Sequence, residues 1–233
     1  MSYTYKRDKT AKYKESDSIS HVHDYGIDIP KNEIFLFPRE EYSYSNVEAS
    51  EEPGIEYTIA NQFIRNIRLL SSTSEEPILI HLKSCGGDWI EGLAMYQAIL
   101  ACPNHVTILN YASARSMSSI IFLAGDKRVM MPYSTFMMHK GMTWLGGTGT
   151  QVRTEYEEFR KSEEIMMDIY VQALRESNPM EGWSDKKIRS WLEKKMKDKE
   201  EVYFTAEEAI EYNFADEIFG KDGKYDWAQL RKP

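Results

Sequence analysis

The 233-residue chain has few of the features that mark exported, membrane-bound or nucleic-acid-binding proteins. It contains only two cysteines, Cys85 and Cys102, whereas a disulfide framework normally uses more. No apolar run approaches the ~20 residues that span a bilayer, and the polar first 18 residues lack the apolar segment of a secretory signal. A net charge of −8 argues against a general nucleic-acid binder, which needs a clustered basic surface. These absences predict a cytoplasmic protein.

Length and composition are those of one globular domain with appendages, because 42% of the residues are hydrophobic and 28% are charged. The polar residues 1–30 are expected to form a flexible N-terminal arm, and residues 31–233 the folded domain. His21 and His23 alternate like one face of a strand, but no cysteine or carboxylate is spaced to complete a metal site. We therefore expect no metal and no cofactor. The acidic stretch 38–54 is interpreted as a surface loop.

Short apolar strands alternate with helical segments through the middle of the chain. Strands are expected at 34–37, 77–82, 106–110, 128–131 and 135–139, and helices at 57–70, 89–102 and 117–124. The segments 84–88 and 112–116 are interpreted as turns. This alternation predicts parallel βαβ units, which cross over right-handed and are covered by helices on both faces. The fold class is therefore α/β.

The last third of the chain is predicted to be mostly helical. Residues 151–176 form a helix long enough to protrude from a compact domain, and residues 184–197 a shorter charged helix. Thr205 and Glu208 have the spacing of a capping box, which begins another helix. A final strand near Ile218 is expected to close the domain.

Three strand ends carry residues that together suit acyl transfer. Ser116 lies where a strand turns into a helix, Gly86 and Gly87 follow the strand 77–82, and His139 ends the strand 135–139. A serine hydroxyl needs an adjacent base to become a nucleophile, and free amides can stabilise an oxyanion. Each residue alone has a more ordinary interpretation, namely a helix cap, a turn and a hydrogen-bonded histidine at a strand end.

The arrangement of four motifs is more specific than any single residue. The segments LKSCGG, ASARSMSSIIFLAG, RVMMPYSTFMMHKG and YFTAEEAIEYNFADEI occur in this order between about Pro77 and Ile218. In sequence and spacing they resemble the proteolytic subunit of the Clp protease (ClpP), of which this chain looks like a divergent member.

The resemblance implies a role for five residues. Ser116 matches the nucleophile of the family and His139 its general base, and the backbone amides of Gly87 and Met117 match the oxyanion hole. The third catalytic residue falls on Glu201, where the family has an aspartate. Two neighbouring carboxylates are alternatives to Glu201, namely Asp198 and Glu200.

The chain departs from the family pattern beside each of these residues. Cys85 replaces a proline before the glycines, Ser118 replaces a glycine after the nucleophile, and Lys140-Gly141 replaces a polar–proline pair after the histidine. The resemblance is weak before Tyr57. These changes leave open a catalytically silent subunit that structures or regulates an active partner.

The resemblance also implies a fold, an assembly and a partner. The fold is the spiral of ββα units shared by ClpP and crotonases, with helices flanking a parallel sheet and the helix 151–176 as a protruding handle. Two stacked seven-membered rings would enclose the sites for polypeptide cleavage. A hexameric ATP-driven unfoldase would deliver substrates, since this chain has no P-loop. A crotonase-type acyl-CoA enzyme is a further alternative, although it needs neither Ser116 nor His139.

Overall fold

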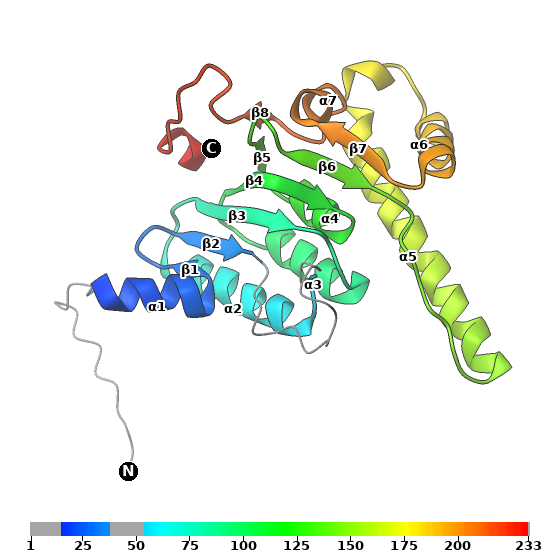
Figure 1. Ribbon diagram of the computed structural model, residues 1–233, viewed down its shortest axis with the longest axis horizontal. Helices are drawn as coiled ribbons and strands as arrows, with labels where there is room; N and C mark the ends of the chain where they lie inside the picture. Colours follow the sequence, from blue (N-terminus) through cyan, green and yellow to red (C-terminus); the bar gives the residue numbers. More distant parts are fainter. Residues whose placement is uncertain (1–14, 38–53, 233) are drawn as a thin grey trace, which may run out of the picture.

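The computed structural model describes residues 15–37 and 54–232, which form a mixed α/β structure around one eight-stranded sheet (Figure 1). The strand order is β1-β2-β3-β4-β5-β8, and β6 pairs with both β4 and β7. The strands are β1 (Ile27–Asp28), β2 (Glu33–Leu36), β3 (Ile78–Ser84), β4 (Val106–Arg115), β5 (Lys127–Met130), β6 (Thr135–Met138), β7 (Val202–Thr205) and β8 (Glu217–Ile218).

Most strand pairs are parallel, as the alternation of strands and helices predicts. Strands β2 to β5 run parallel in succession, β8 is parallel to β5, and β6 is parallel to β4. Two pairs are antiparallel, namely β1 with β2 and β7 with β6. The α/β fold class is confirmed.

Strand β4 is longer than its apolar run suggests. The expected turn at 112–116 is wrong, because β4 continues to Arg115. Its first half pairs with β5 through 107–110, and its second half pairs with β6 through 113–115. The small residues of the second half thus have backbone partners that lie about 20 residues further along the chain.

Helices α2 (Tyr57–Thr73), α3 (Trp89–Leu100) and α4 (Met117–Leu123) lie close to their expected bounds. The side chains of Ile78, Ile80 and Leu82 on β3 belong to the same core as the buried faces of these helices. The opposite face of the sheet differs from the expectation of helices on both sides. There, Leu79, Leu109 and Val129 pack with Phe219 and Leu230 of the C-terminal segment, which contains the short η3 (Gln229–Arg231).

The N-terminal region is more regular than the expected arm. Residues 15–25 form α1 (Glu15–Tyr25), so that His21 and His23 lie on a helix and not on a strand, and β1 then pairs with β2. The predicted flexible arm over 1–30 is therefore wrong for the part from residue 15 onward, and residues 1–14 lie outside the described residues. So does nearly all of the acidic loop predicted over 38–54.

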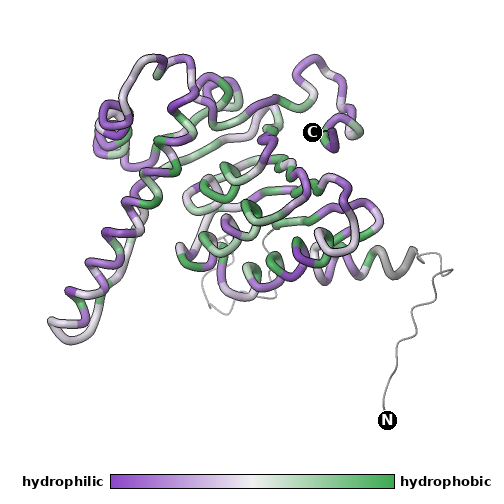
Figure 2. Tube along the Cα trace, turned by 180° about the vertical axis from the view of Figure 1, so that it is seen from behind, coloured by the Kyte–Doolittle hydropathy of each residue, from purple (hydrophilic) through white to green (hydrophobic). Residues whose placement is uncertain are grey.

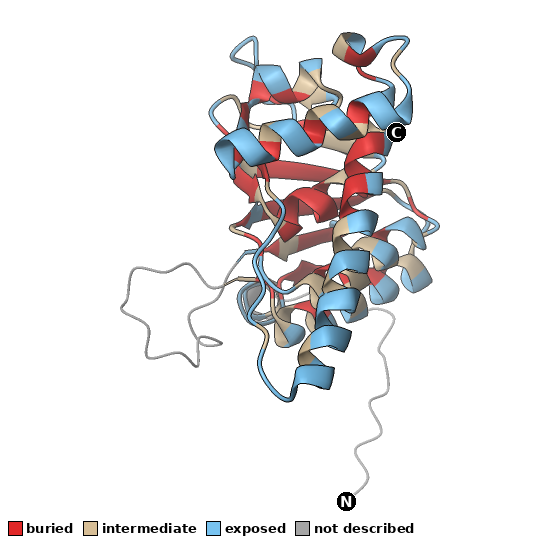
Figure 3. Cartoon of the chain, turned by 90° about the vertical axis from the view of Figure 1, so that its right-hand side faces the viewer, coloured by how far each residue is buried: buried red, intermediate tan, exposed pale blue. Residues whose placement is uncertain are grey.

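Helix α5 (Gly149–Arg175) is the protruding element predicted over 151–176 (Figure 1). It begins with a capping box between Thr148 and Gln151. Its second half packs into the core through residues such as Met166 and Tyr170, and its first half is mostly exposed (Figure 3). The exposed half is mostly hydrophilic, with a few hydrophobic residues between the polar ones (Figure 2).

The chain returns from α5 to the sheet through η2 (Asn178–Met180), α6 (Asp185–Lys199), β7 and α7 (Ala206–Glu211). The capping box predicted at Thr205 and Glu208 is present at the start of α7. The rings of Phe136, Phe204 and Phe214 lie together behind β6, with 4.6 Å between the stacked rings of Phe136 and Phe214. Among the described helices, none has the length and apolar composition to cross a membrane.

Candidate active site

The parallel pairing of β4 and β6 brings Ser116 and His139 together. Both strands end at the same edge of the sheet, because parallel neighbours share a direction. The residue after each strand is therefore near the other, and the Ser116 amide donates to the Met137 carbonyl at 3.0 Å. His139 Nε2 lies 2.6 Å from Ser116 Oγ, which is hydrogen-bond distance for a serine and its base.

Ser116 has a backbone conformation that non-glycine residues rarely adopt. Its φ is 52° and its ψ is −124°. Such a conformation costs about 1–3 kcal/mol and persists only where surrounding contacts enforce it. The residue occupies the N-cap position of α4, but its side chain makes no capping hydrogen bond. The hydroxyl therefore points at His139 and has no part in capping.

The glycine turn after β3 packs directly against the nucleophile. A Cβ at Gly86 would lie 2.6 Å from the Cβ of Ser116, so only glycine allows this approach. The neighbouring chain segment holds the turn from the other side, since Ile55 N donates to Gly86 O at 2.6 Å and Asp88 N donates to Ile55 O at 2.8 Å. Gly87 lies between these two hydrogen bonds.

One cavity of about 940 Å³ contains all five residues that the sequence predicts for the site. Ser116, His139, Glu201, Gly87 and Met117 line it together. Met117 is the first residue of α4, where a backbone N–H has no acceptor within the helix. The cavity extends along the exposed half of α5, so an elongated substrate has room to lie beside that helix.

His139 is half-buried, and its surroundings set its basicity. Burial lowers the pKa of the imidazole because the charged form loses hydration, while the charge of Glu201 acts in the opposite direction. Glu201 itself is exposed and accepts a hydrogen bond from the Tyr203 hydroxyl at 2.8 Å. The carboxylate thus acts on His139 through its charge, and its hydrogen bond is to Tyr203.

The two alternative carboxylates lie outside the cavity lining. Helix α6 ends at Lys199, and Glu200 follows with a φ of 57°. Asp198 therefore does not share a continuous helical face with Glu201. Of these three acidic residues, only Glu201 lines the cavity.

Several residues at the site were not expected from sequence. Tyr203 lines the cavity beside Glu201, and the guanidinium of Arg115 lies 5.8 Å from the Tyr203 ring centre. Side chains alternate between the two faces of β7, so Tyr203 and Thr205 lie on its exposed face. This alternation is present in the sequence and could have predicted that Tyr203 faces outward. Of the departures from the family pattern, Cys85 and Lys140 line the cavity, whereas Ser118 is fully buried.

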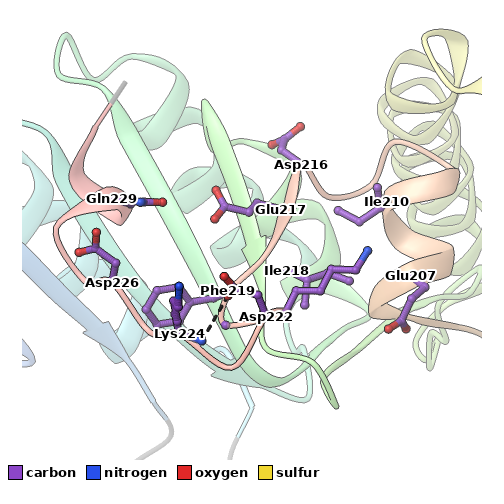
Figure 4. Close-up of a pocket in the computed structure, with 12 residues that line it drawn as sticks. Glu207, Ile210, Asp216, Glu217, Ile218, Phe219, Asp222, Lys224, Asp226 and Gln229 are labelled. Atoms are coloured by element: carbon purple, nitrogen blue, oxygen red, sulfur yellow. Dashed lines mark hydrogen bonds between the residues drawn. The ribbon is translucent and has the colours of Figure 1, made fainter.

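A second cavity of about 690 Å³ lies at the C-terminal segment, far along the chain from the serine and histidine (Figure 4). Its lining is mostly acidic among the charged residues, with Asp216, Glu217 and Asp222, and contains the two lysines Lys221 and Lys224. None of the five predicted site residues lines it. Among the described residues, no group of three or more histidine, cysteine or acidic side chains could hold a metal ion.

Comparison with known proteins identifies the family of the chain. The Clp protease family model matches residues 48–222. The chain is 29% identical over 163 residues to the ATP-dependent Clp protease proteolytic subunit 2 of Thermobifida fusca, which covers 69% of this chain and 74% of that protein. It is 32% identical over 164 residues to the proteolytic subunit 3 of a Synechococcus species, with 69% and 76% covered. The resemblance found in the four motifs is thereby confirmed, and the chain belongs to the Clp protease family.

Proposed function

We propose that this chain is a serine endopeptidase in which Ser116 is the nucleophile and His139 the general base. The observation that carries the proposal is the 2.6 Å distance between Ser116 Oγ and His139 Nε2 at the wall of a large cavity. The hydroxyl lacks a capping partner in α4, and burial lowers the pKa of the His139 ring, which favours its neutral form. A neutral imidazole beside a serine hydroxyl is the arrangement that acyl transfer requires.

The reaction follows from these positions. Ser116 Oγ attacks the peptide carbonyl carbon while His139 Nε2 takes the hydroxyl proton, and the carbonyl oxygen becomes an oxyanion. The amides of Gly87 and Met117 donate to that oxyanion. Collapse breaks the C–N bond, and His139 returns the proton to the leaving amine. Water then attacks the acyl ester with His139 as base, which releases the acid and restores Ser116.

Glu201 is proposed as the acid of the triad. It lines the same cavity as His139, and its charge favours the imidazolium that forms during attack. In the described conformation its carboxylate binds Tyr203, so orientation of His139 by a direct hydrogen bond requires a change of the Glu201 rotamer.

The proposal includes an assembly and a partner. The curated relatives carry names of ATP-dependent proteolytic subunits, and family membership supports a ring-shaped oligomer that encloses the cavities. Unfolded polypeptides, delivered by a separate ATP-driven unfoldase, and short peptides would be the substrates. A cytoplasmic location fits this role.

Covalent labelling tests the peptidase proposal. A fluorophosphonate is expected to modify wild-type protein at Ser116, and a fluorogenic peptide to be hydrolysed. Ser116→Ala should abolish both and leave the fold intact, because the Ser116 hydroxyl makes no capping hydrogen bond in α4. A silent subunit or a crotonase-type enzyme predicts neither labelling nor a Ser116-dependent rate. Absence of labelling at Ser116, or hydrolysis that does not depend on Ser116, would therefore contradict the proposal.

A further inference from the structure

Ser119 lies one helical turn behind the nucleophile and makes two hydrogen bonds to it. The Ser116 carbonyl oxygen accepts from the Ser119 amide at 3.0 Å and from the Ser119 hydroxyl at 2.6 Å. Ser119 is fully buried, so water does not compete for either bond. One residue therefore holds the direction of the Ser116 carbonyl with two donors.

That carbonyl belongs to the same peptide group as the Met117 N–H. The peptide group is planar, and in its trans form the C=O and N–H bonds point in opposite directions. The Ser119 bonds draw the Ser116 oxygen toward the inside of α4, and they consequently direct the Met117 N–H toward the cavity. This constraint matters here because the Ser116 backbone is in a rarely populated conformation, with a φ of 52°.

Tyr170 of α5 extends the hydrogen-bond chain. Its hydroxyl lies 2.7 Å from Ser119 Oγ, and its side chain is buried in the core. The Ser119 proton is directed at the Ser116 carbonyl, which can only accept, so the Tyr170 hydroxyl is the donor to Ser119. Burial raises the pKa of Tyr170 far above its usual value, which keeps this donor protonated. The result is a chain from Tyr170 to Ser119 to the Ser116 carbonyl.

The other proposed oxyanion donor is braced separately. Ser118 Oγ donates to Ser84 Oγ at 2.7 Å, and Ser84 Oγ also accepts from Gly86 N at 3.2 Å. These contacts hold the glycine turn that carries Gly87. A change at Ser119 should therefore affect the Met117 donor and leave the Gly87 donor in place.

We propose that Ser119, backed by Tyr170, is a positioning residue that aims the Met117 amide at the oxyanion. The proposal rests on the peptidase function proposed above. Ser119 has no contact with substrate in this role. It acts only when the carbonyl oxygen of the substrate becomes negatively charged, so its loss should lower kcat and leave KM almost unchanged.

The test compares Ser119→Ala with a matched control, Ser177→Ala. Ser177 is likewise buried and donates from its hydroxyl to the carbonyl three residues earlier, at 2.7 Å, but it lies outside the site. Fluorophosphonate end-point titration counts reactive subunits, and kcat is expressed per reactive subunit. Because a misaimed donor costs less than the ~100-fold or more seen on removing one, we expect Ser119→Ala to lower kcat about 10-fold with KM within about 2-fold. Ser177→Ala should leave both constants unchanged.

A peptide aldehyde supplies a readout that folding alone would not change. Ser116 Oγ adds to the aldehyde carbon, and the resulting oxyanion occupies the same position as in the reaction. The affinity of the protein for the peptide aldehyde should fall in Ser119→Ala by about the same factor as kcat. Tyr170→Phe should have a smaller effect, of about 3-fold, because Ser119 keeps its bond to Ser116.

The double variant Ser119→Ala/Tyr170→Phe leaves no buried hydroxyl without its partner, and serves if Ser119→Ala alone misfolds. It should have the same kcat as Ser119→Ala, because Tyr170 acts only through Ser119. A kcat within about 2-fold of wild type in the folded Ser119 variants, with Ser116→Ala inactive, overturns the positioning role and leaves the peptidase intact. Wild-type protein without Ser116-dependent hydrolysis overturns both.

Discussion

At the scale of single residues, the surroundings of His139 set the basicity of its ring. Burial lowers its pKa from the usual 6.5, and the charge of Glu201 offsets only part of that effect. A general base must be neutral, so kcat/KM should rise with pH through a midpoint below 6.5 and stay level above it. A pH–rate profile with a fluorogenic peptide measures this midpoint. A value at or above 6.5 would show that the ring is more hydrated than the structure indicates.

The charge of Glu201 can be removed without removing its bulk. Glu201→Gln should lower the plateau rate by orders of magnitude, because the imidazolium loses a neighbouring carboxylate. It should also move the midpoint of the pH profile further down, since the charge that raises the pKa of His139 is gone. Glu201→Asp should keep part of the rate. Glu200→Gln, at an exposed neighbour outside the cavity lining, is the control and should behave like wild type.

At the scale of elements, the glycine turn between β3 and α3 depends on its contact with Ile55. A Cβ at Gly87 would lie 2.2 Å from the Ile55 carbonyl oxygen, and Gly87 has a φ of 149°. Gly87→Ala should therefore displace the turn and its amide, and lower kcat by about 100-fold or more, the typical loss for one oxyanion donor. Steady-state kinetics measures the loss, and circular dichroism verifies that the fold is retained.

Gly223 provides the matched control for Gly87. Its φ of 77° is also positive, but a Cβ there would meet nothing within 4 Å. Gly223→Ala introduces comparable backbone strain far from Ser116, so its kcat should equal that of wild type. If both variants lose activity equally, strain in the chain and not the position of the amide is responsible.

At the scale of the whole molecule, the protruding part carries apolar side chains that the single chain does not cover. Met142 and Trp144 in the segment before α5 are 84% and 95% exposed. We expect these residues to be covered by other copies in a ring assembly. Light scattering should then give a mass of about seven or fourteen times the 27.2 kDa of one chain. A monodisperse monomer at micromolar concentration would contradict the assembly.

A pair of substitutions distinguishes a specific role of the segment before α5 from a general effect of removing an exposed aromatic side chain. Trp144→Ser should weaken the assembly and shift the scattering mass to smaller species. Tyr133→Ser changes an equally exposed aromatic residue in a different segment, at the turn before β6, and should leave the mass unchanged. If both variants dissociate alike, the segment before α5 has no special part in the assembly.

Local sequence patterns were sufficient to predict the order of strands and helices and to place the reactive residues at strand ends. These features depend on local patterns, namely apolar spacing, glycine turns and capping boxes such as that at Thr205. Because β4 and β6 are parallel neighbours, Ser116 and His139 lie at the same edge of the sheet, and the predicted pair is within hydrogen-bond distance. The motif order was enough to identify the family.

The groups from distant parts of the chain that complete the site are apparent only in the packed fold. The second half of β4 has too little apolar character to predict a strand, and it is held by pairing with β6. Ile55 beside Gly87 and Tyr170 beside Ser119 are contacts between residues 32 and 51 positions apart. In the sequence, Tyr170 is one of the apolar residues of a long helix. The structure shows that its buried hydroxyl has Ser119 as its hydrogen-bond partner. Such pairings arise from how layers pack, and hydrogen bonds across layers leave no periodic signal in the sequence.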